Sequence, residues 1–290
     1  MKSSASLTTP ALLLAAAAIS FAAIFFRKAA PTHPLCSAGI RLLIAAVLLS
    51  PLTVRAALKG RLPPRVLGGA TLAGLFYGLH FGTWVTSLTF TSVAASVTLV
   101  TATPLLLAGV SFVTGRDRPD RRLWSALGLA LCGVLILGAH DSALKGDALL
   151  GDALALAGAG AMVGYLLLGR RLGPGLDVWA FSGVATAVGA ATLLGAALVA
   201  GVPVTVSRDA FTWLLLSALV PQLIGHTLLT WALRHVRPTV VGIATVGEPV
   251  GATLLAWAWL GDRPSALVLV GCAVTLSAVI IAVARPTADH

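Results

Sequence analysis

The sequence predicts an all-α membrane protein of ten transmembrane helices, and three observations lead to that fold class. The composition is strongly apolar, ten apolar segments follow one another with short links, and the two halves of the chain share motifs. Of the 290 residues, 58% are hydrophobic and only 10% are charged, whereas roughly a quarter of the residues in a soluble domain are charged. With a mean hydropathy of +0.96, the chain cannot cover a soluble surface and is too apolar for disorder. No polar stretch is long enough to fold as an attached soluble domain.

The ten predicted spans follow from the length of the apolar segments, because a membrane-crossing helix needs about 20 mostly apolar residues. The links between them are short and hold the turn-forming and charged residues, as in 55–65, 115–122 and 169–177. The fifth span is the shortest. The predicted spans are Pro10–Phe26, Leu35–Thr53, Val66–Ser87, Ser92–Thr114, Leu123–Gly138, Leu149–Leu168, Val178–Ala200, Phe211–Leu233, Thr239–Leu260 and Ser265–Val283.

The distribution of Lys and Arg predicts the orientation. With the N-terminus in the cytoplasm, most basic residues fall in the inner links, as the positive-inside rule requires. The outer links hold only Arg27, Lys28, Lys145, Arg208 and Arg263, and Arg41 lies within a span. We therefore expect both termini in the cytoplasm of a multi-pass protein of the cell membrane, which an even number of spans allows.

The net charge of +10, from 20 Lys and Arg against 10 Asp and Glu, does not indicate a nucleic-acid partner. No polar domain is present to carry a basic patch, and the basic residues suit the membrane orientation instead. The three cysteines, Cys36, Cys132 and Cys272, lie in apolar stretches, where cysteine behaves as a small hydrophobe. We expect no disulfide and no metal site. The apolar run after the first residues resembles a signal peptide, but an uncleaved first span fits the rest of the chain better.

An internal repeat divides the chain into residues 1–145 and 146–290. Pro104 matches Pro249, and the DRP motif at 117–119 matches the one at 262–264, both at an offset of 145. His80 and His226 are 146 residues apart. Because each copy would hold five spans, an odd number, the second copy must be inverted in the membrane. Inverted repeats with a site at their interface are a common transporter architecture; duplication for packing alone is the alternative.

Pro104 and Pro249 lie in the middle of the fourth and ninth predicted spans. Proline lacks an N–H group, so the carbonyls of Val100 and Thr245 lose their helical partners. Backbone freed at this depth is tolerated where protein or a hydrated cavity receives it. The sequence leaves two interpretations open, a harmless kink and a break that lines a cavity.

Glycines predict where helices pack closely, since small residues let helices approach each other in lipid. Gly74, Gly78 and Gly82 form one face of the third span, and His80 points away from that face. Gly160 and Gly164 make a similar pair on the sixth span. These patterns indicate close helix contact and carry no chemistry.

Glu248 is the only glutamate of the chain and directly precedes Pro249 near the middle of the ninth span. A carboxylate at this depth is expensive and is a functional candidate by default. It could be protonated and deprotonated during a transport cycle. The alternative is a structural hydrogen bond, to Arg41 or His80. The equivalent position in the first half is Thr103, so the two halves are not functionally equal.

Polar and aromatic residues on inward faces are the other candidates for substrate binding or coupling. His80 and His226 occupy matched places in the two halves, and histidine changes charge near physiological pH; two satisfied interior histidines are the alternative. Such a mixture would suit a metabolite with an apolar part and a polar head. Two histidines and one glutamate on separate spans are no recognisable metal-ligand pattern. The cavity candidates are Tyr77, His80, Trp84, Gln222, His226 and Trp231, with Gln222, His226 and Thr230 forming a stripe at i, i+4 and i+8.

Arg41 lies about two turns into the second span. It could contact an anionic group of the substrate or pair with Glu248. An arginine at this depth more often extends to the membrane interface, and we slightly favour that interpretation.

These motifs resemble the EamA-type transporters of the drug/metabolite transporter superfamily over nearly the whole chain. The resemblance rests on GIRLLIAA (39–46), SVAASVTLVTATPLLLA (92–108), GDALALAGAGAMVGYLLLGRR (151–171) and, most specifically, GEPVGATLLAWAWLGDRP (247–264). It implies export of small metabolites, such as amino acids, or of drugs by alternating access. It also implies a central cavity lined by spans one to four and six to nine, with five and ten peripheral, and it places Arg41, Glu248 and Pro249 at motif positions.

We therefore expect a secondary transporter that exports a small metabolite, amino-acid-like or amphipathic, with proton coupling as an open possibility. No GxxxxGK[ST] loop for nucleotide binding is present, and we expect neither a cofactor nor enzymatic activity. A facilitative uptake carrier is the nearest alternative, followed by an intramembrane enzyme and a non-transporting scaffold. The lipid bilayer and a small-molecule substrate are the expected partners, and the sequence leaves monomer or homodimer open.

Overall fold

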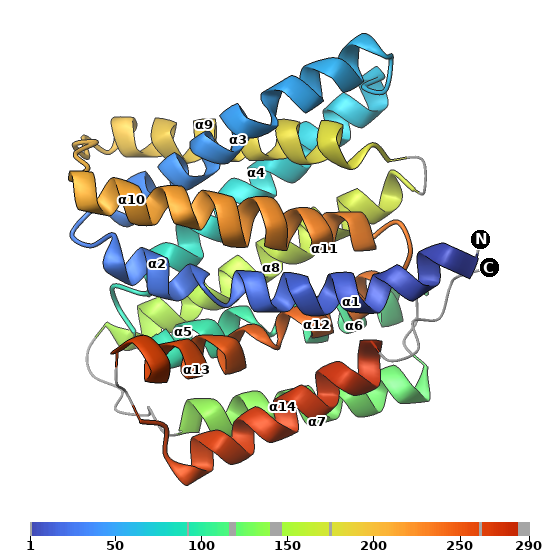
Figure 1. Cartoon of the computed structure of the whole chain (residues 1–290), viewed down its shortest axis with the longest axis vertical. Helices are drawn as coiled ribbons and strands as arrows, with labels where there is room; N and C mark the ends of the chain where they lie inside the picture. Colours follow the sequence, from blue (N-terminus) through green and yellow to red (C-terminus); the bar gives the residue numbers. More distant parts are fainter. Residues whose placement is uncertain are drawn as a thin grey trace.

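The computed structural model describes residues 2–91, 93–115, 120–139, 147–173, 176–260 and 263–283, and every regular element in these ranges is a helix. The helices run side by side as one bundle (Figure 1). In chain order they are α1 (Lys2–Ile19), α2 (Ala22–Lys28), α3 (Pro34–Leu58), α4 (Pro64–Ser87), α5 (Val93–Val100), α6 (Thr103–Thr114), α7 (Arg121–Ala139), α8 (Ala148–Arg171), α9 (Val178–Val199), α10 (Arg208–Ser217), the π-helix η1 (Ala218–His226), α11 (Thr227–Ala232), α12 (Pro238–Thr245), α13 (Glu248–Leu260) and α14 (Ala266–Val283).

Each of the ten apolar segments predicted from the sequence coincides with helical structure. Six are single long helices, α3, α4, α7, α8, α9 and α14. The other four are interrupted: α1 is followed by α2, α5 by α6, α12 by α13, and α10 continues through η1 into α11. The interruptions fall inside the predicted spans, so the backbone departs from α-helix at four places along the bundle.

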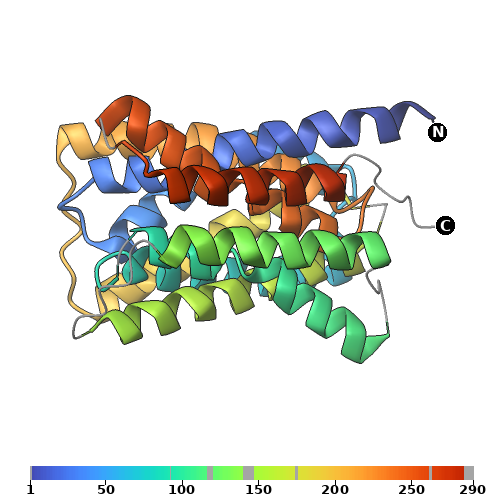
Figure 2. The same cartoon turned by 90° about the horizontal axis from the view of Figure 1, so that it is seen from below.

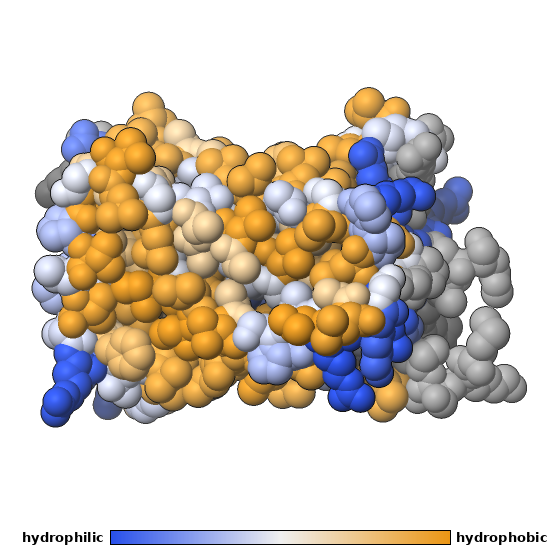
Figure 3. Space-filling model, turned by 90° about the horizontal axis from the view of Figure 1, so that it is seen from above, coloured by the Kyte–Doolittle hydropathy of each residue, from blue (hydrophilic) through white to orange (hydrophobic). Residues whose placement is uncertain are grey.

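Six helical segments in the described part of the chain are long and apolar enough to cross a membrane. Two shorter apolar helices, Thr103–Thr114 and Ala266–Ala282, accompany them. Figure 3 shows apolar side chains over the middle of the bundle and hydrophilic groups gathered toward its two ends, as a bilayer-embedded surface requires. The six segments are Leu7–Lys28, Pro34–Leu58, Leu149–Arg171, Val178–Val199, Arg208–Ala232 and Pro238–Trp259.

The two halves of the chain run through the bundle in opposite directions. Figure 1 shows α1 starting at one end of the bundle and α8 starting at the other. Equivalent helices of the two halves pack on each other, α3 on α9 and α7 on α14, and α6 packs on α12, the counterpart of α5. The pair α7 and α14 lies at one edge of the bundle (Figure 1). Several predicted features lie outside the described residues: the boundary at residues 145 and 146, the whole DRP motif at 117–119, Asp262 of the second DRP motif, and Arg116, Lys145 and Arg285.

The described chain begins and ends at the same end of the bundle. Figure 2 shows the start of α1 and the end of α14 on one side. This arrangement fits an even number of passes along the direction of the helices.

The glycine face of α4 packs directly on α9, as the sequence predicts. A Cβ atom on Gly74 would lie 2.6 Å from Cβ of Val188 and 2.7 Å from the carbonyl oxygen of Ala185. A Cβ on Gly78 would lie 3.2 Å from the carbonyl oxygen of Gly189. The two helix backbones therefore approach so closely that a methyl group does not fit at Gly74 without movement of backbone.

The expectation for Gly160 is wrong. Gly160 is exposed, and nothing lies within 4 Å of the place where its Cβ would be. The close contacts of α8 with α4 pass through Gly158, beside Thr83, and Gly164, beside Phe76. The four-residue spacing alone could not show which face of the helix turns toward a neighbour.

Replacing Gly74 by alanine is expected to destabilise the protein by about 1–3 kcal/mol, because the added methyl overlaps α9. Gly68 is the matched control on the same helix, since it is exposed and open space surrounds its Cβ position. Gly68→Ala should be neutral or stabilising by up to about 1 kcal/mol, as alanine favours helix. Thermal unfolding of both purified variants measures the difference; equal melting temperatures would contradict the close α4–α9 contact.

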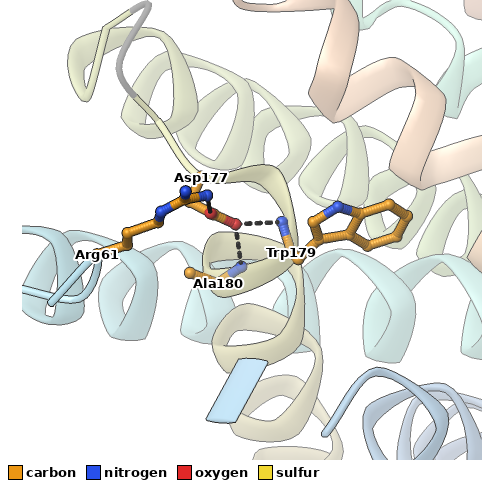
Figure 4. A network of polar contacts seen from close by, with 4 residues as sticks. All are labelled: Arg61, Asp177, Trp179 and Ala180. Atoms are coloured by element: carbon orange, nitrogen blue, oxygen red, sulfur yellow. Dashed lines mark hydrogen bonds and ion pairs between the residues drawn. The ribbon is translucent and has the colours of Figure 1, made fainter. Parts of the chain in front are cut away.

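An ion pair joins the α3–α4 turn to the start of α9 (Figure 4). Nη1 of Arg61 lies 2.9 Å from Oδ2 of Asp177, and Oδ1 of Asp177 accepts hydrogen bonds from the backbone N–H groups of Trp179 and Ala180, both at 3.1 Å. Asp177 is therefore the N-cap of α9. Burial acts to raise the pKa of Asp177, but the Arg61 guanidinium and the two N–H groups outweigh it and hold that pKa below its usual value.

Asp177→Asn is expected to lower the stability by about 1 kcal/mol at neutral pH through the loss of charge at the cap and of the ion pair. A carboxyl whose pKa is lowered on folding stabilises the fold above its unfolded pKa and loses this effect as the pH falls through the folded value. The difference from wild type should therefore disappear below roughly pH 4. Melting temperatures across pH 3–7 test this. Asp147→Asn is the control, because Asp147 precedes α8 and its side chain accepts no hydrogen bond from the N–H groups of that helix.

Candidate functional site

The four interrupted segments meet around one cavity in the middle of the bundle. Its volume is about 40 Å³, and since a single water needs roughly 10–15 Å³ by the same kind of measure, it holds only a few waters. The lining residues come from the break between α1 and α2, from both sides of the α5–α6 and α12–α13 breaks, and from α4, α8 and η1. They are Ile19, Ala22, His80, Trp84, Val100, Thr101, Thr103, Met162, His226, Thr245 and Glu248.

Prolines produce two of the breaks, as the sequence predicts. Pro104 and Pro249 are the second residues of α6 and α13, a position where the missing N–H is harmless. Thr103 Oγ1 donates a hydrogen bond of 2.9 Å to the carbonyl of Val100, one of the two carbonyls expected to be freed. Because residues on both sides of each break line the cavity, the structure supports a cavity-lining break and not a harmless kink.

Glu248 is the first residue of α13 and lines the cavity. Its carboxylate lies at a helix N-terminus, where the helix dipole favours negative charge. Within the described ranges it forms neither a hydrogen bond nor an ion pair, so the structural bond to Arg41 or His80 considered above is not made. The carboxylate thus faces the cavity without a protein partner.

His80 is held by α8 and keeps one nitrogen unpartnered. Its Nδ1 lies 2.9 Å from the carbonyl oxygen of Gly158. A carbonyl can only accept, so Nδ1 carries the proton of this bond and, in the neutral ring, Nε2 is left as an acceptor. The ring stacks on Trp84 with centroids 6.1 Å apart. The indole Nε1 of Trp84 is buried and has no hydrogen-bond partner in the part of the chain described.

A π-helix positions the residues of the eighth span. It runs from Ala218 to His226, includes Pro221, and is a kind of distortion that recurs at functional sites. His226 lines the cavity and meets the rings of Tyr77 and Phe81, each with centroids 5.5 Å away. The predicted polar stripe does point inward: Gln222 Nε2 donates to the hydroxyl of Tyr77 at 2.9 Å, and the hydroxyls of Thr230 and Tyr165 lie 2.7 Å apart.

Arg41 is buried completely, so the expectation that it extends to the membrane interface is wrong. Its guanidinium lies between two aromatic rings, 5.3 Å from the centroid of Phe26 and 4.5 Å from that of Phe81. Nη2 donates to Oε1 of Gln222 at 3.1 Å. Cation–π contacts and an amide oxygen replace water around the charge, which is why Arg41 can remain inside the bundle.

The predicted site residues therefore fall into three groups. The first lines the cavity: His80, Trp84, Thr103, His226 and Glu248. Arg41, Tyr77 and Gln222 form a buried polar cluster behind the rings that surround the cavity. Trp231 lies apart from both, against His235 with centroids 4.2 Å apart.

Sequence reasoning missed Phe26, Phe81 and Tyr165, which supply the rings around Arg41 and Tyr77. In an apolar span an aromatic residue gives no local sign of its contacts. It also missed the π-helix, for which Pro221 was the available sign. Across the described ranges, no three His, Cys, Asp or Glu side chains are placed to hold a metal ion.

Comparison with known proteins assigns a family and a fold. The model of the EamA-like transporter family matches twice, over residues 8–139 and 149–284. No curated protein matches the sequence. A solved structure titled "Crystal structure of protein" is similar with a TM-score of 0.77 and 17% identity, over 97% of this chain and 96% of that one. At this identity the likeness concerns the fold alone.

Thr103→Val is expected to destabilise the protein by about 1 kcal/mol, because the carbonyl of Val100 loses its hydrogen bond inside the bundle. Thr114→Val is the control on the same helix, since Thr114 is exposed and its hydroxyl bonds only to the preceding turn, at Val110. Thermal unfolding compares the two. Equal melting temperatures would show that the break at Pro104 does not depend on this bond.

Proposed function

Because the chain belongs to the EamA-like transporter family, we propose that it is a secondary transporter that moves a small metabolite across the membrane by alternating access. Its membrane-spanning helices and its family make it a multi-pass membrane protein. We further propose that it crosses the cell membrane ten times, with both termini on the cytoplasmic side. The start of α1 and the end of α14 at one end of the bundle and the Lys and Arg bias of the links support this topology.

The observation that carries the proposal is the meeting of broken helices around Glu248. Non-helical backbone at membrane depth occurs where it lines a cavity, and discontinuous helices at a repeat interface are typical of transporter binding sites. Here the α1–α2, α5–α6 and α12–α13 breaks and η1 all contribute to one cavity. A scaffold would have no need of a partnerless carboxylate at such a point.

The size of the cavity supports a cycle with more than one conformation. At about 40 Å³ it is far below the roughly 300–1,000 Å³ of pockets that hold small molecules. A substrate therefore requires the helices around it to separate. The packing is unequal between equivalent surfaces: α4 packs extensively on α9, whereas its counterpart, the span formed by α10, η1 and α11, packs less extensively on α3. The looser side is where we expect the bundle to open.

Glu248 is the proposed proton carrier, with His80 and His226 beside it in the cavity. The imidazoles and Trp84 would contact the polar and apolar parts of the substrate. We propose export as the direction of transport because of the family resemblance. The alternative is a facilitative uptake carrier, and the flux experiment described next distinguishes the two.

Glu248→Gln is expected to abolish the response of transport to a pH gradient, because the amide cannot carry a proton. A thermal-shift screen of amino acids, nucleobases, sugars and cationic dyes first identifies the compound that most raises the melting temperature. This compound then serves as the substrate for flux measurements in proteoliposomes with an imposed pH gradient. Wild type should give flux that follows the gradient, and the variant should not.

Asp147→Asn is the control for the loss of an acid outside the membrane-spanning helices and should transport like wild type. Unchanged flux and unchanged pH dependence in Glu248→Gln would remove Glu248 from the mechanism. Wild-type flux that equilibrates the substrate without any response to the gradient would favour a facilitative carrier.

A further inference from the structure

Arg41 holds a positive charge inside the bundle with an incomplete set of partners. The side chain has no exposed surface, and its Nε and Nη1 atoms have no hydrogen-bond partner among the residues described. Only Nη2 is bonded, to the neutral amide oxygen of Gln222. A guanidinium offers five N–H donors and cannot lose its proton, so most of its donors are left unused in this conformation.

An unpaired buried charge is costly, and buried charges in proteins are paired or bound to a ligand. The described groups in contact with Arg41 are neutral: the rings of Phe26 and Phe81, over which the guanidinium lies, Gln222 at Nη2, and Tyr77 bonded to Gln222. Among the described residues, the acid near Arg41 is Glu248, which makes no ion pair with it. The missing partner is therefore an anion that this conformation does not contain.

We propose that Arg41 binds the anionic group of the transported substrate, and that the substrate is an organic anion with an apolar or aromatic body. This inference rests on the proposed transport function and specifies its ligand. The free N–H groups of Arg41 match the geometry of a carboxylate, which a guanidinium binds through charge-assisted hydrogen bonds. Phe26 and Phe81, which contact the guanidinium, both contact Trp84 of the cavity lining. These three rings suit an apolar body better than a small inorganic ion.

The groups that cover Arg41 belong to the irregular parts of the fold. Arg41 itself is on α3, a continuous helix that packs along α9. Phe26 is on α2, just after the α1–α2 break, and Gln222 is on η1. Movement of either segment uncovers the guanidinium from the cavity side while α3 stays in place. Phe81 touches both His80 and His226 of the cavity lining, with centroids 4.8 and 5.5 Å away, so one ring separates the covered charge from two residues that line the cavity.

The competing occupant is Glu248, which could pair with Arg41 in another conformation. The two possibilities differ in a measurable way. If the substrate anion binds Arg41, removal of the Glu248 charge leaves anion binding intact or strengthens it, because a competing negative charge is lost. If Glu248 is the sole partner of Arg41, the protein has no preference for anionic ligands.

The test measures binding of three probes of matched shape to the full chain in lipid nanodiscs by calorimetry: 3-phenylpropionate, 3-phenylpropan-1-ol and 3-phenylpropylammonium. Wild type should bind the anion roughly ten- to a hundredfold more tightly than the alcohol, as expected for a hydrogen bond to a charged group, and the ammonium least. Arg41→Gln should remove this preference, and Arg41→Lys should keep part of it. Arg61→Gln, which removes an exposed charge at the α3–α4 turn, should bind like wild type.

Gln222→Glu gives a second test that does not depend on Arg41 variants folding. The replacement has the same shape and places a carboxylate 3.1 Å from Nη2, so the chain supplies the missing anion itself. It should raise the melting temperature and abolish the preference for 3-phenylpropionate over the alcohol.

Three results would overturn the proposal: wild type that does not prefer 3-phenylpropionate to the alcohol, a preference that survives Arg41→Gln, or a preference that survives Gln222→Glu. Glu248→Gln separates this inference from the proposed function. Loss of proton-driven flux with intact anion preference supports both, and intact flux with intact anion preference contradicts only the role of Glu248 in coupling.

Discussion

The structure depends on one constraint, that backbone N–H and C=O groups inside an apolar bundle need partners from the protein itself. Four segments depart from α-helix inside the bundle, and each departure frees groups of this kind. They are brought to the same place, around a small cavity, where a hydroxyl such as that of Thr103 bonds one of the freed carbonyls. The outer helices can remain regular because the irregular backbone is collected in the centre. The cavity thus lies where the helices are interrupted, because interruptions are tolerated only where the freed backbone groups find partners.

The two halves share an architecture but differ in chemistry. α6 and α13 both start at the cavity with proline as their second residue, yet the first residue is Thr103 in one and Glu248 in the other. The Thr103 hydroxyl donates a hydrogen bond to the backbone carbonyl of Val100. The Glu248 carboxylate lines the cavity and has no partner among the described residues. Duplication therefore explains the frame, and a single substitution between equivalent positions supplies the ionisable group. The centre is therefore chemically asymmetric, because only the second half contributes an acid, even though the backbone of the two halves is nearly symmetric.

A basic and an acidic side chain lie in this centre without contacting each other in the described structure. Arg41 is embedded among rings and bonded to Gln222, and Glu248 stands at a helix N-terminus on the cavity wall. Each is stabilised locally, by cation–π contacts in one case and by the helix dipole in the other. Because neither is neutralised by the other, both remain available to a mobile partner, a substrate or a proton. Arg41 lies on α3, which packs on α9. The same α9 also packs closely on α4, where glycines allow the two helix backbones to approach.

The sequence by itself determined the helical segments and two of the four breaks, those at Pro104 and Pro249. The length of the apolar segments and the two prolines, Pro104 and Pro249, act on the local backbone and can be identified from the sequence. So can Glu248, because it is the only glutamate of the chain and lies within an apolar span. The sequence also placed His80 away from the glycine face of α4. The tertiary structure alone decided that Arg41 is buried, that Gly160 faces outward, that η1 is a π-helix and that Trp231 stands apart from the cavity. The bond from Arg41 to Gln222 joins residues 181 positions apart, and such a contact depends on how every helix between them packs. Local rules fix what each segment can form, whereas the partner of a side chain is set by the whole bundle.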